Sequence, residues 1–386
     1  MIRLFNTTKF LLPLITKHYC FFAKRKSFIL NNHKTLTMSF TPIKAALCSF
    51  GMSGKVFHGP FLSVNNQFIL HGSWERSTKT IQQYYPDVIS YDSYEALLAD
   101  DDVELVIVNT PNITHYDFAK RALRAGKHVI IEKPFTVTEQ EGKELIAIAQ
   151  QEGRKLSGFQ NRRYDSDFLT VKDVINKKLL GNIVEAELHY DRYMEGLSYK
   201  VHKETPVKGT GMLYDLGSHM IDQALQLFGK PTSLFADIRI VREISKVDDY
   251  FEVLLYYRNL RVRIVATTLA REPRGYIING TKGSFIKPKT NIQEEALAGG
   301  KLPIGEDWGK EDEAFWGLLH TEKDGSIIRE LVPTIKGNYM AYFDGIYKAI
   351  REGADVPVLP ESSVEVVRII EAAFESSNTG KVIQLA

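Results

Sequence analysis

The sequence predicts an α/β protein with two domains: a doubly wound parallel sheet first, then an α+β domain with a large open, mainly antiparallel sheet. Three observations lead to this prediction. The chain has 386 residues, which is longer than a single domain usually is. Apolar strand patterns alternate with helical patterns up to about residue 160. Beyond that point, long runs rich in Val, Ile, Tyr and Phe follow one another without a helix between them.

The first half contains a strand–helix alternation. Helical patterns cover 93–103, 114–128 and 136–153, with Ser93 placed as an N-terminal cap and Gly126 as a C-terminal stop. A further helical pattern starts at Val56, and we expect Gly59-Pro60 to interrupt it. The expected strands are 43–50, 67–74, 104–110, 128–134 and 154–161. Strands and helices at this spacing form βαβ units and a parallel sheet.

The second half begins with two helical patterns, 168–181 and 213–229, separated by a strand pattern at 183–193. Strand-rich runs follow, with turns expected at Arg258-Asn259 and Asn279-Gly280. These runs are 232–242, 250–270 and 275–288, and two terminal helices are expected around 342–353 and 362–377. We therefore predict a dinucleotide-binding domain over 42–160 and a substrate-binding and oligomerisation domain over 161–386.

The composition excludes several classes of partner. With 44% hydrophobic residues, 25% charged residues and a net charge of +2, the chain has no overall field for nucleic acid or a membrane surface. Its two cysteines, Cys20 and Cys48, provide neither a disulfide framework nor a metal cluster. No stretch reaches the length of a transmembrane helix. We expect a cytoplasmic protein that binds a small molecule.

Residues 1–41 differ from the rest of the chain. The first acidic residue is Glu75, while seven Lys and Arg residues precede residue 38. A basic segment without acids is typical of a targeting leader. Alternatively Met38 is the true start and the residues before it are upstream sequence. The apolar piece FLLPLIT is short and contains a proline, which argues against a secretory signal, and we favour Met38 as the start.

A glycine-containing turn follows the first expected strand. A strand, the sequence SFGMSG and then a helix is where a dinucleotide-binding fold places its phosphate loop, here made by Phe50, Gly51, Met52, Ser53 and Gly54. Ser49 stands where the first glycine of the fingerprint is usual. The second expected strand ends with Glu75 and Arg76. An acid at this place accepts from ribose hydroxyls and an arginine binds a 2′-phosphate, so the choice between NAD and NADP stays open.

Polar clusters follow three of the expected strands, at 110–115, 132–134 and 160–165. In an open α/β sheet the ligand lies beyond the carboxyl ends of the strands, so these clusters would surround it. Lys133 is notable, since it comes directly after the buried strand pattern HVIIE, where an unpaired lysine is rarely found.

The helical pattern at 213–229 carries a polar stripe. Asp215, His219, Asp222 and Gln226 follow helical spacing on an otherwise apolar helix. An aspartate one turn before a histidine can hold its imidazole in one tautomer. Hydride removal from an alcohol requires loss of the hydroxyl proton, which His219 would accept while Lys133 stabilises the developing alkoxide. Asp and His would also suit a metal, but further ligands are not evident, so no metal is expected.

These motifs together resemble the Gfo/Idh/MocA family of NAD(P)-dependent oxidoreductases, from about Ile43 to the C-terminus. The resemblance is carried by FGMSGKVFHGP, VNTPNITHYDFAKRALRAGKHVIIEKPFTVT, FQNRRYDSDFLTV, GMLYDLGSHMIDQALQLFG and GNYMAY, and looks strongest toward the scyllo-inositol dehydrogenase branch. It implies a catalytic set of Lys133, Asp215 and His219, a commonly cis Lys133–Pro134 bond, and a cofactor lined by Thr110, Pro111, Asn112, His115, Glu132 and Lys133. It also implies oligomers, dimers or tetramers, formed through the open sheet.

Three functions remain open on this basis. The first is a dehydrogenase of a cyclic polyol or sugar, with substrate hydroxyls bound by Asn161, Arg163, Asp165, Tyr193 and Tyr214. The second is an NAD-dependent glycosidase of the same fold, and the third is a non-catalytic dinucleotide sensor. Retention of both Lys133 and His219 favours catalysis. The segment 200–204 reads KVHKE where this branch often has Trp-Arg-Glu, so part of the substrate pocket is expected to differ.

Overall fold

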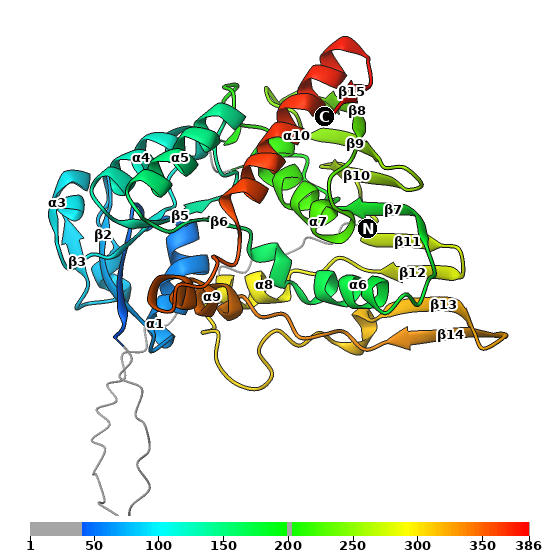
Figure 1. Ribbon diagram of the computed structural model, residues 1–386, viewed down its shortest axis with the longest axis horizontal. Coiled ribbons are helices and arrows are strands. Elements are labelled where there is room, and N and C mark those ends of the chain that lie inside the picture. Colours follow the sequence, from blue (N-terminus) through cyan, green and yellow to red (C-terminus); the bar gives the residue numbers. More distant parts are fainter. Residues whose placement is uncertain (1–40, 199–202, 386) are drawn as a thin grey trace, which may run out of the picture. The chain divides into compact units, whose positions relative to one another are not determined.

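The computed structural model describes residues 41–198 and 203–385 (Figure 1). The predictions for residues 1–40 lie outside this part of the chain. The described residues form a six-stranded sheet and a nine-stranded sheet, with helices packed against both. The predicted fold class is confirmed.

The first sheet is parallel throughout and has the strand order β3-β2-β1-β4-β5-β6. Its strands are β1 (Ile43–Leu47), β2 (Phe68–Trp74), β3 (Ile89–Tyr91), β4 (Leu105–Val108), β5 (His128–Glu132) and β6 (Leu156–Phe159). All but β3 were predicted, and three residues are too few for β3 to show a periodic pattern. The order reverses direction between β1 and β4, and ligands of such sheets bind at this switch point.

Both faces of this sheet are covered. Ala45 and Leu47 of β1 pack in a cluster with α1 (Gly59–Val64) and α9 (Met340–Arg351). Ala46 and Cys48 face the opposite cluster. That cluster also contains residues of α3 (Tyr94–Ala99), α4 (His115–Arg124) and α5 (Glu139–Gln151). The C-terminal half of the chain thus supplies α9 to complete the core of the first sheet.

The expected interruption at Gly59-Pro60 is wrong. The chain forms a π-helical turn, η1 (Gly54–His58), and continues directly into α1, where Pro60 lies in the first turn. A proline is tolerated there because the acceptor of its missing N–H would lie in η1, so Pro60 removes no hydrogen bond within α1. Gly59 is required at the junction, since a Cβ would lie 2.8 Å from the Gly54 carbonyl oxygen.

The second sheet has the order β14-β13-β12-β11-β7-β10-β9-β8-β15, and only β7 and β10 are parallel neighbours. Its strands are β7 (Ile183–His189), β8 (Ser233–Arg239), β9 (Tyr250–Tyr256), β10 (Arg261–Thr267), β11 (Tyr276–Gly280), β12 (Gly283–Lys287), β13 (Gly317–Lys323), β14 (Ser326–Val332) and β15 (Ile383–Gln384). The turn expected at Asn279-Gly280 lies two residues later. Gly280 belongs to β11, where a Cβ would meet the Leu180 carbonyl oxygen at 2.2 Å.

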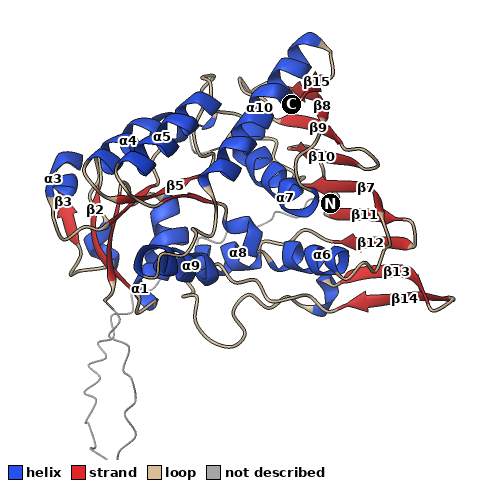
Figure 2. Ribbon diagram, viewed as in Figure 1, coloured by secondary structure: helices blue, strands red, loops and turns tan. Residues whose placement is uncertain are grey.

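Helices cover one face of the second sheet (Figure 2). These are α6 (Ser166–Asn176), α7 (Ser218–Phe228) and α10 (Pro360–Thr379), whose apolar residues share one core with β7 to β12. Along β9 the residues alternate between buried and half-buried, as expected when only one face is packed. Within the described residues, no helix has the length and apolar character needed to cross a bilayer.

Candidate active site

The turn after β1 fits a dinucleotide phosphate. A Cβ at Gly54 would be 2.8 Å from the carbonyl oxygen of Ser49, so only glycine lets the start of η1 pack this closely on the turn after β1. At Gly51 a Cβ would have only the Ser49 hydroxyl within 4 Å, so the outer side of the turn is open. Ser49 accepts a hydrogen bond from Gly51 N at 3.2 Å, and Phe50 is buried against Tyr84. The turn therefore leaves room for a ligand at its backbone.

Glu75 and Arg76 lie differently at the end of β2. Glu75 is buried, and its carboxylate accepts hydrogen bonds from Thr80 N (2.9 Å) and Ile81 N (3.1 Å) at the start of α2 (Ile81–Tyr84). Arg76 is exposed, and we find no ion pair for it in the described part of the chain. The carboxylate expected to accept from a ribose is thus engaged with the protein, whereas the guanidinium remains available.

The carboxylate of Glu132 ties the end of β5 to the phosphate turn. Its Oε1 accepts hydrogen bonds from Ser53 Oγ and, at 2.9 Å, from His58 Nε2. Burial acts to raise the pKa of Glu132, but the bonds from His58 and Ser53 outweigh burial and keep the pKa below its ordinary value. His58 is fully buried on η1 and had no recognisable signal in the sequence. Glu132 therefore fixes the position of Lys133.

The loop after β4 is anchored on both sides. His115 is buried, and its two ring nitrogens lie 2.9 Å from the Pro134 and Thr110 carbonyl oxygens. The hydroxyl of Thr110 accepts from Thr114, and Pro111 precedes the short helix η2 (Asn112–Thr114). Asn112 donates from Nδ2 to the Gly209 carbonyl of the second domain. Another residue at this strand end, Asn109, was missed; its buried Oδ1 has no partner in the described residues.

Lys133 bridges the two domains. The bond to Pro134 is cis, as the resemblance implied. The Lys133 Nζ donates to Asp215 Oδ1 at 2.8 Å and to the Asp215 carbonyl oxygen at 2.6 Å. Asp215 belongs to η5 (Leu213–Gly217), a π-helical turn that leads into α7. Its other oxygen, Oδ2, accepts from Lys203 Nζ at 2.6 Å, a contact that the sequence did not predict.

His219 lies beside this ion pair, but Asp215 does not orient it, which corrects the interpretation of the polar stripe. The His219 Nδ1 is 3.0 Å from Gln160 Oε1. The π-helical turn changes the helical register between residues 215 and 219, so the aspartate points to the lysines. Gln160 donates its own Nε2 to the Ser218 carbonyl at 3.5 Å, which presents Oε1 to the ring. The Nδ1 therefore carries the proton, and the lone pair is on Nε2.

The electrostatics of this cluster follow from burial and its neighbours. Burial, together with the charges of Lys133 and Arg162, lowers the pKa of His219 well below 6.5, so its ring is neutral at pH 7. Burial lowers the pKa of Lys133, and Asp215 opposes this effect. Burial acts to raise the pKa of Asp215, but Lys133 and Lys203 lower it well below 3.8. The cluster is a carboxylate between two ammonium groups beside a neutral imidazole.

The residues predicted to bind substrate are not all brought to this cluster. Asn161 begins the short helix η3 (Asn161–Tyr164) after β6, is buried, and has no side-chain hydrogen bond in the described residues. Arg163 forms a two-point ion pair with Asp222 at 2.8 and 2.6 Å. Asp165 is buried between Lys289 (3.1 Å) and the Tyr339 hydroxyl (2.5 Å). Tyr193 is 38% exposed, with Arg271 over its ring at 3.8 Å.

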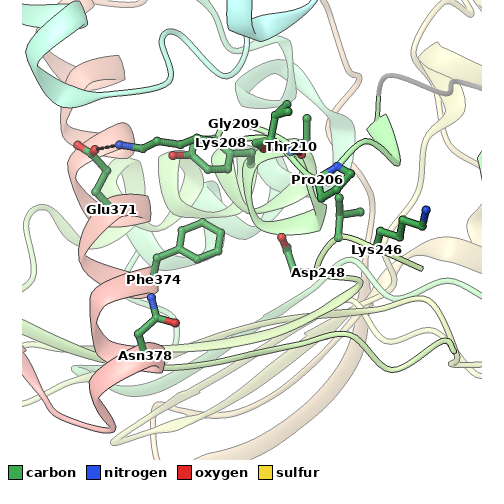
Figure 3. A pocket seen from close by; sticks show the side chains of 12 residues that line it. Pro206, Lys208, Gly209, Thr210, Lys246, Asp248, Glu371, Phe374 and Asn378 are labelled. Carbon is green, nitrogen blue, oxygen red and sulfur yellow. Dashed lines mark hydrogen bonds and ion pairs between the residues drawn. The ribbon is translucent and has the colours of Figure 1, made fainter. Parts of the chain in front are cut away.

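Tyr214 lines a separate cavity of about 450 Å³ (Figure 3). Its ring stacks on Phe374 of α10, and its hydroxyl donates to the Val137 carbonyl at 3.0 Å. The cavity lies between α10 and two loops, and its lining includes none of the three proposed catalytic residues. The loop residues are Pro206, Val207, Lys208, Gly209, Thr210, Lys246, Val247 and Asp248. Tyr214 thus points away from the side of η5 that Asp215 occupies.

Similarity to known proteins agrees with this architecture. Residues 43–159 match an oxidoreductase family described as having an NAD-binding Rossmann fold, and residues 172–385 match its C-terminal alpha/beta domain. The chain is 39% identical over 345 residues to scyllo-inositol 2-dehydrogenase (NADP(+)) IolW of Bacillus subtilis (strain 168). That alignment covers 89% of this chain and 96% of the relative.

Solved structures are similar over the same span. A crystal structure from Bacteroides fragilis has a TM-score of 0.82 at 43% identity and covers 89% of this chain and 100% of that chain. The crystal structure of an oxidoreductase from Bacillus cereus has a TM-score of 0.82 at 32% identity, with coverage of 89% and 99%. The chain therefore belongs to the Gfo/Idh/MocA family and is an NAD(P)-dependent oxidoreductase.

Proposed function

We propose that the chain transfers a hydride between NADP and a secondary alcohol or ketone of a cyclic polyol or sugar. The observation that carries this proposal is the cluster of Lys133, Asp215 and His219 beyond the ends of β5 and β6. It combines an ammonium group fixed by a carboxylate with a neutral imidazole whose Nε2 has no partner in the described residues. Oxidation of an alcohol requires such a pair, one group for the oxygen and one for its proton.

Lys133 and His219 have different roles at the substrate hydroxyl group. Lys133 donates a hydrogen bond to that oxygen and stabilises the alkoxide character that develops on it. His219 accepts the hydroxyl proton at Nε2, since Gln160 holds the other ring nitrogen protonated. Asp215 orients Lys133 through two hydrogen bonds. The nicotinamide ring, when bound, accepts the hydride in oxidation and supplies it in reduction.

The cofactor is held by the turn after β1 and by the strand ends around it. Phe50, Gly51, Met52, Ser53 and Gly54 would surround the diphosphate, and Thr110, Pro111 and Asn112 would line the opposite side. Glu75 is bound to the start of α2, while Arg76 is exposed beside it. A free guanidinium matches a 2′-phosphate, so NADP is favoured over NAD.

The substrate class rests on two arguments. The relative IolW is named for scyllo-inositol, a cyclic polyol, and NADP. In this chain the cluster offers hydrogen-bonding groups rather than an apolar wall, since Lys203 is bonded to Asp215 and Gln160 to His219. Arg163, Asp165 and Tyr214 are engaged with other protein groups, so their predicted contacts to substrate would require those bonds to break.

The open face of the second sheet favours self-association. Its half-buried and exposed residues include Tyr250, Leu254 and Tyr256 of β9 and Ile327 of β14, a mixture typical of subunit interfaces. We propose a homo-oligomer formed through this face.

Light scattering of the full chain should give a mass at least twice the 43.9 kDa of one chain, and a monomer at micromolar concentration would contradict the proposal.

Turnover of a polyol is the first prediction. The full chain should reduce NADP in the presence of at least one member of a panel of inositols and aldoses, measured by nicotinamide absorbance. Cofactor binding without turnover, followed by hydrolysis of aryl glycosides, would instead support the glycosidase. Binding without either reaction would support a sensor.

Arg76→Ala should discriminate between the cofactors. Loss of a charge-assisted hydrogen bond to the 2′-phosphate should lower kcat/KM for NADP by about 10- to 100-fold, with kcat/KM for NAD unchanged. The control is Arg124→Ala, which removes an exposed arginine of α4 that pairs with Glu152. Equal effects of Arg76→Ala on both cofactors would contradict the assignment.

The pH dependence should report the buried histidine. Because the pKa of His219 is lowered, the ring stays neutral as the pH falls through 6.5. The kcat/KM for alcohol oxidation should therefore remain level below pH 6.5 and fall only at distinctly lower pH. A half-loss of activity near pH 6.5 would show that another, solvent-exposed base accepts the proton. His219→Asn should lose activity across the whole range.

A further inference from the structure

A second ammonium group shares the carboxylate that fixes Lys133. Lys203 Nζ donates to Asp215 Oδ2 at 2.6 Å, while Lys133 Nζ donates to Oδ1 at 2.8 Å. The exposed fraction of the side chain rises from 19% for Lys133 to 25% for Asp215 and 35% for Lys203. Lys203 therefore approaches Asp215 from the solvent side, and Lys133 from the protein interior.

The two ammonium groups act on each other through this arrangement. Asp215 attracts the positive charge of Lys133 and favours its protonated form, whereas the like charge of Lys203 disfavours it. With one lysine on each oxygen, the carboxylate is also shared and cannot direct both oxygens to Lys133. Lys203 thus weakens the ion pair between Lys133 and Asp215 in two ways. Its positive charge repels the Lys133 ammonium, and it competes with Lys133 for the carboxylate.

We propose that Lys203 is a positioning residue of this oxidoreductase, which shares Asp215 so that the Lys133 ammonium can turn to the substrate oxygen and donate to it effectively. The inference rests on the proposed role of Lys133. A hydrogen-bond donor stabilises an alkoxide best when its own proton is not held too tightly by another acceptor. Without Lys203, Asp215 would hold Lys133 as a closed ion pair.

The other titratable groups near Lys133 do not compete with it for Asp215. Glu132 precedes Lys133 on β5, but its carboxylate is bound by His58 and Ser53. On α7, His219 is neutral. Glu204, next to Lys203 in the chain, does not compete for the Lys203 ammonium, because its carboxylate accepts from Ser198 N at 2.7 Å and faces Arg242 at 3.8 Å.

The test follows the titration of Lys133 itself. Competitive labelling of lysine amines in the cofactor-free full chain, read by peptide mass spectrometry over a range of pH, gives the pKa of each lysine. In Lys203→Met the pKa of Lys133 should rise by about 1 pH unit, because the repelling charge is lost and Asp215 is released to Lys133. Lys203→Arg keeps the charge and should leave that pKa close to the wild-type value.

Two further measurements complete the experiment. In the turnover assay, the alkaline limb of kcat/KM should move to higher pH in Lys203→Met. The size of this move should equal the rise in the pKa of Lys133 measured by labelling. Lys208→Met is the matched control, since it removes a cation from the same segment that pairs with Glu371 at 2.9 Å, and it should shift neither readout. NADP affinity should be unchanged in all three variants, which verifies that they are folded.

The possible failures can be told apart. An unchanged Lys133 titration in Lys203→Met overturns the role of Lys203, whether or not the wild type turns over. The proposal is also overturned if the pKa of Lys133 rises in Lys203→Met while the alkaline limb of kcat/KM stays at the same pH. The effect of Lys203 on Lys133 would then have no consequence for catalysis. Absence of turnover in the wild type with every polyol overturns the proposed function, while the labelling result still decides whether Lys203 acts on Lys133.

Discussion

The ion pair between Lys133 and Asp215 is the interaction on which the rest of the site depends. It joins the end of a parallel strand in the first domain to a π-helical turn in the second, so neither domain contains a complete site. A lysine at this depth is stable only with a carboxylate partner, and the carboxylate in turn needs the lysines. The arrangement of the two domains and the chemistry of the site are therefore coupled through this ion pair.

The surrounding polar bonds keep this contact in place. Glu132 is held by His58 and Ser53, which connects the phosphate turn to the residue directly before Lys133. His115 bonds to the carbonyl of Pro134, the residue directly after it. On the other side, Gln160 fixes the ring of His219. Residues that resemble cofactor or substrate ligands thus act partly as supports, and groups positioned in this way can stabilise charge without rearranging during the reaction.

Much of the fold was predictable from the sequence, because strand and helix periodicities were strong and turn residues separated them. The short strand β3, the edge strands β14 and β15 and the neighbouring strand β13 were not recognised, since their residues are few or largely exposed. Lys133 and His219 were found because a charged or titratable residue in an apolar pattern is unusual. The roles of Gln160, His58 and Lys203 depend on contacts between distant segments, and two of these contacts arise at π-helical turns, which have no sequence periodicity of their own.

The role of Lys133 is tested by Lys133→Met in the full chain, with turnover of a reactive polyol and the dissociation constant of NADP measured side by side. We expect kcat to fall by about a thousandfold or more, since the donor to the developing alkoxide is lost, while NADP binds as in the wild type. Lys143→Met, at an exposed lysine of α5 that pairs with Glu139, should change neither quantity. Turnover of Lys133→Met at the wild-type rate would show that Lys133 does not stabilise the alkoxide.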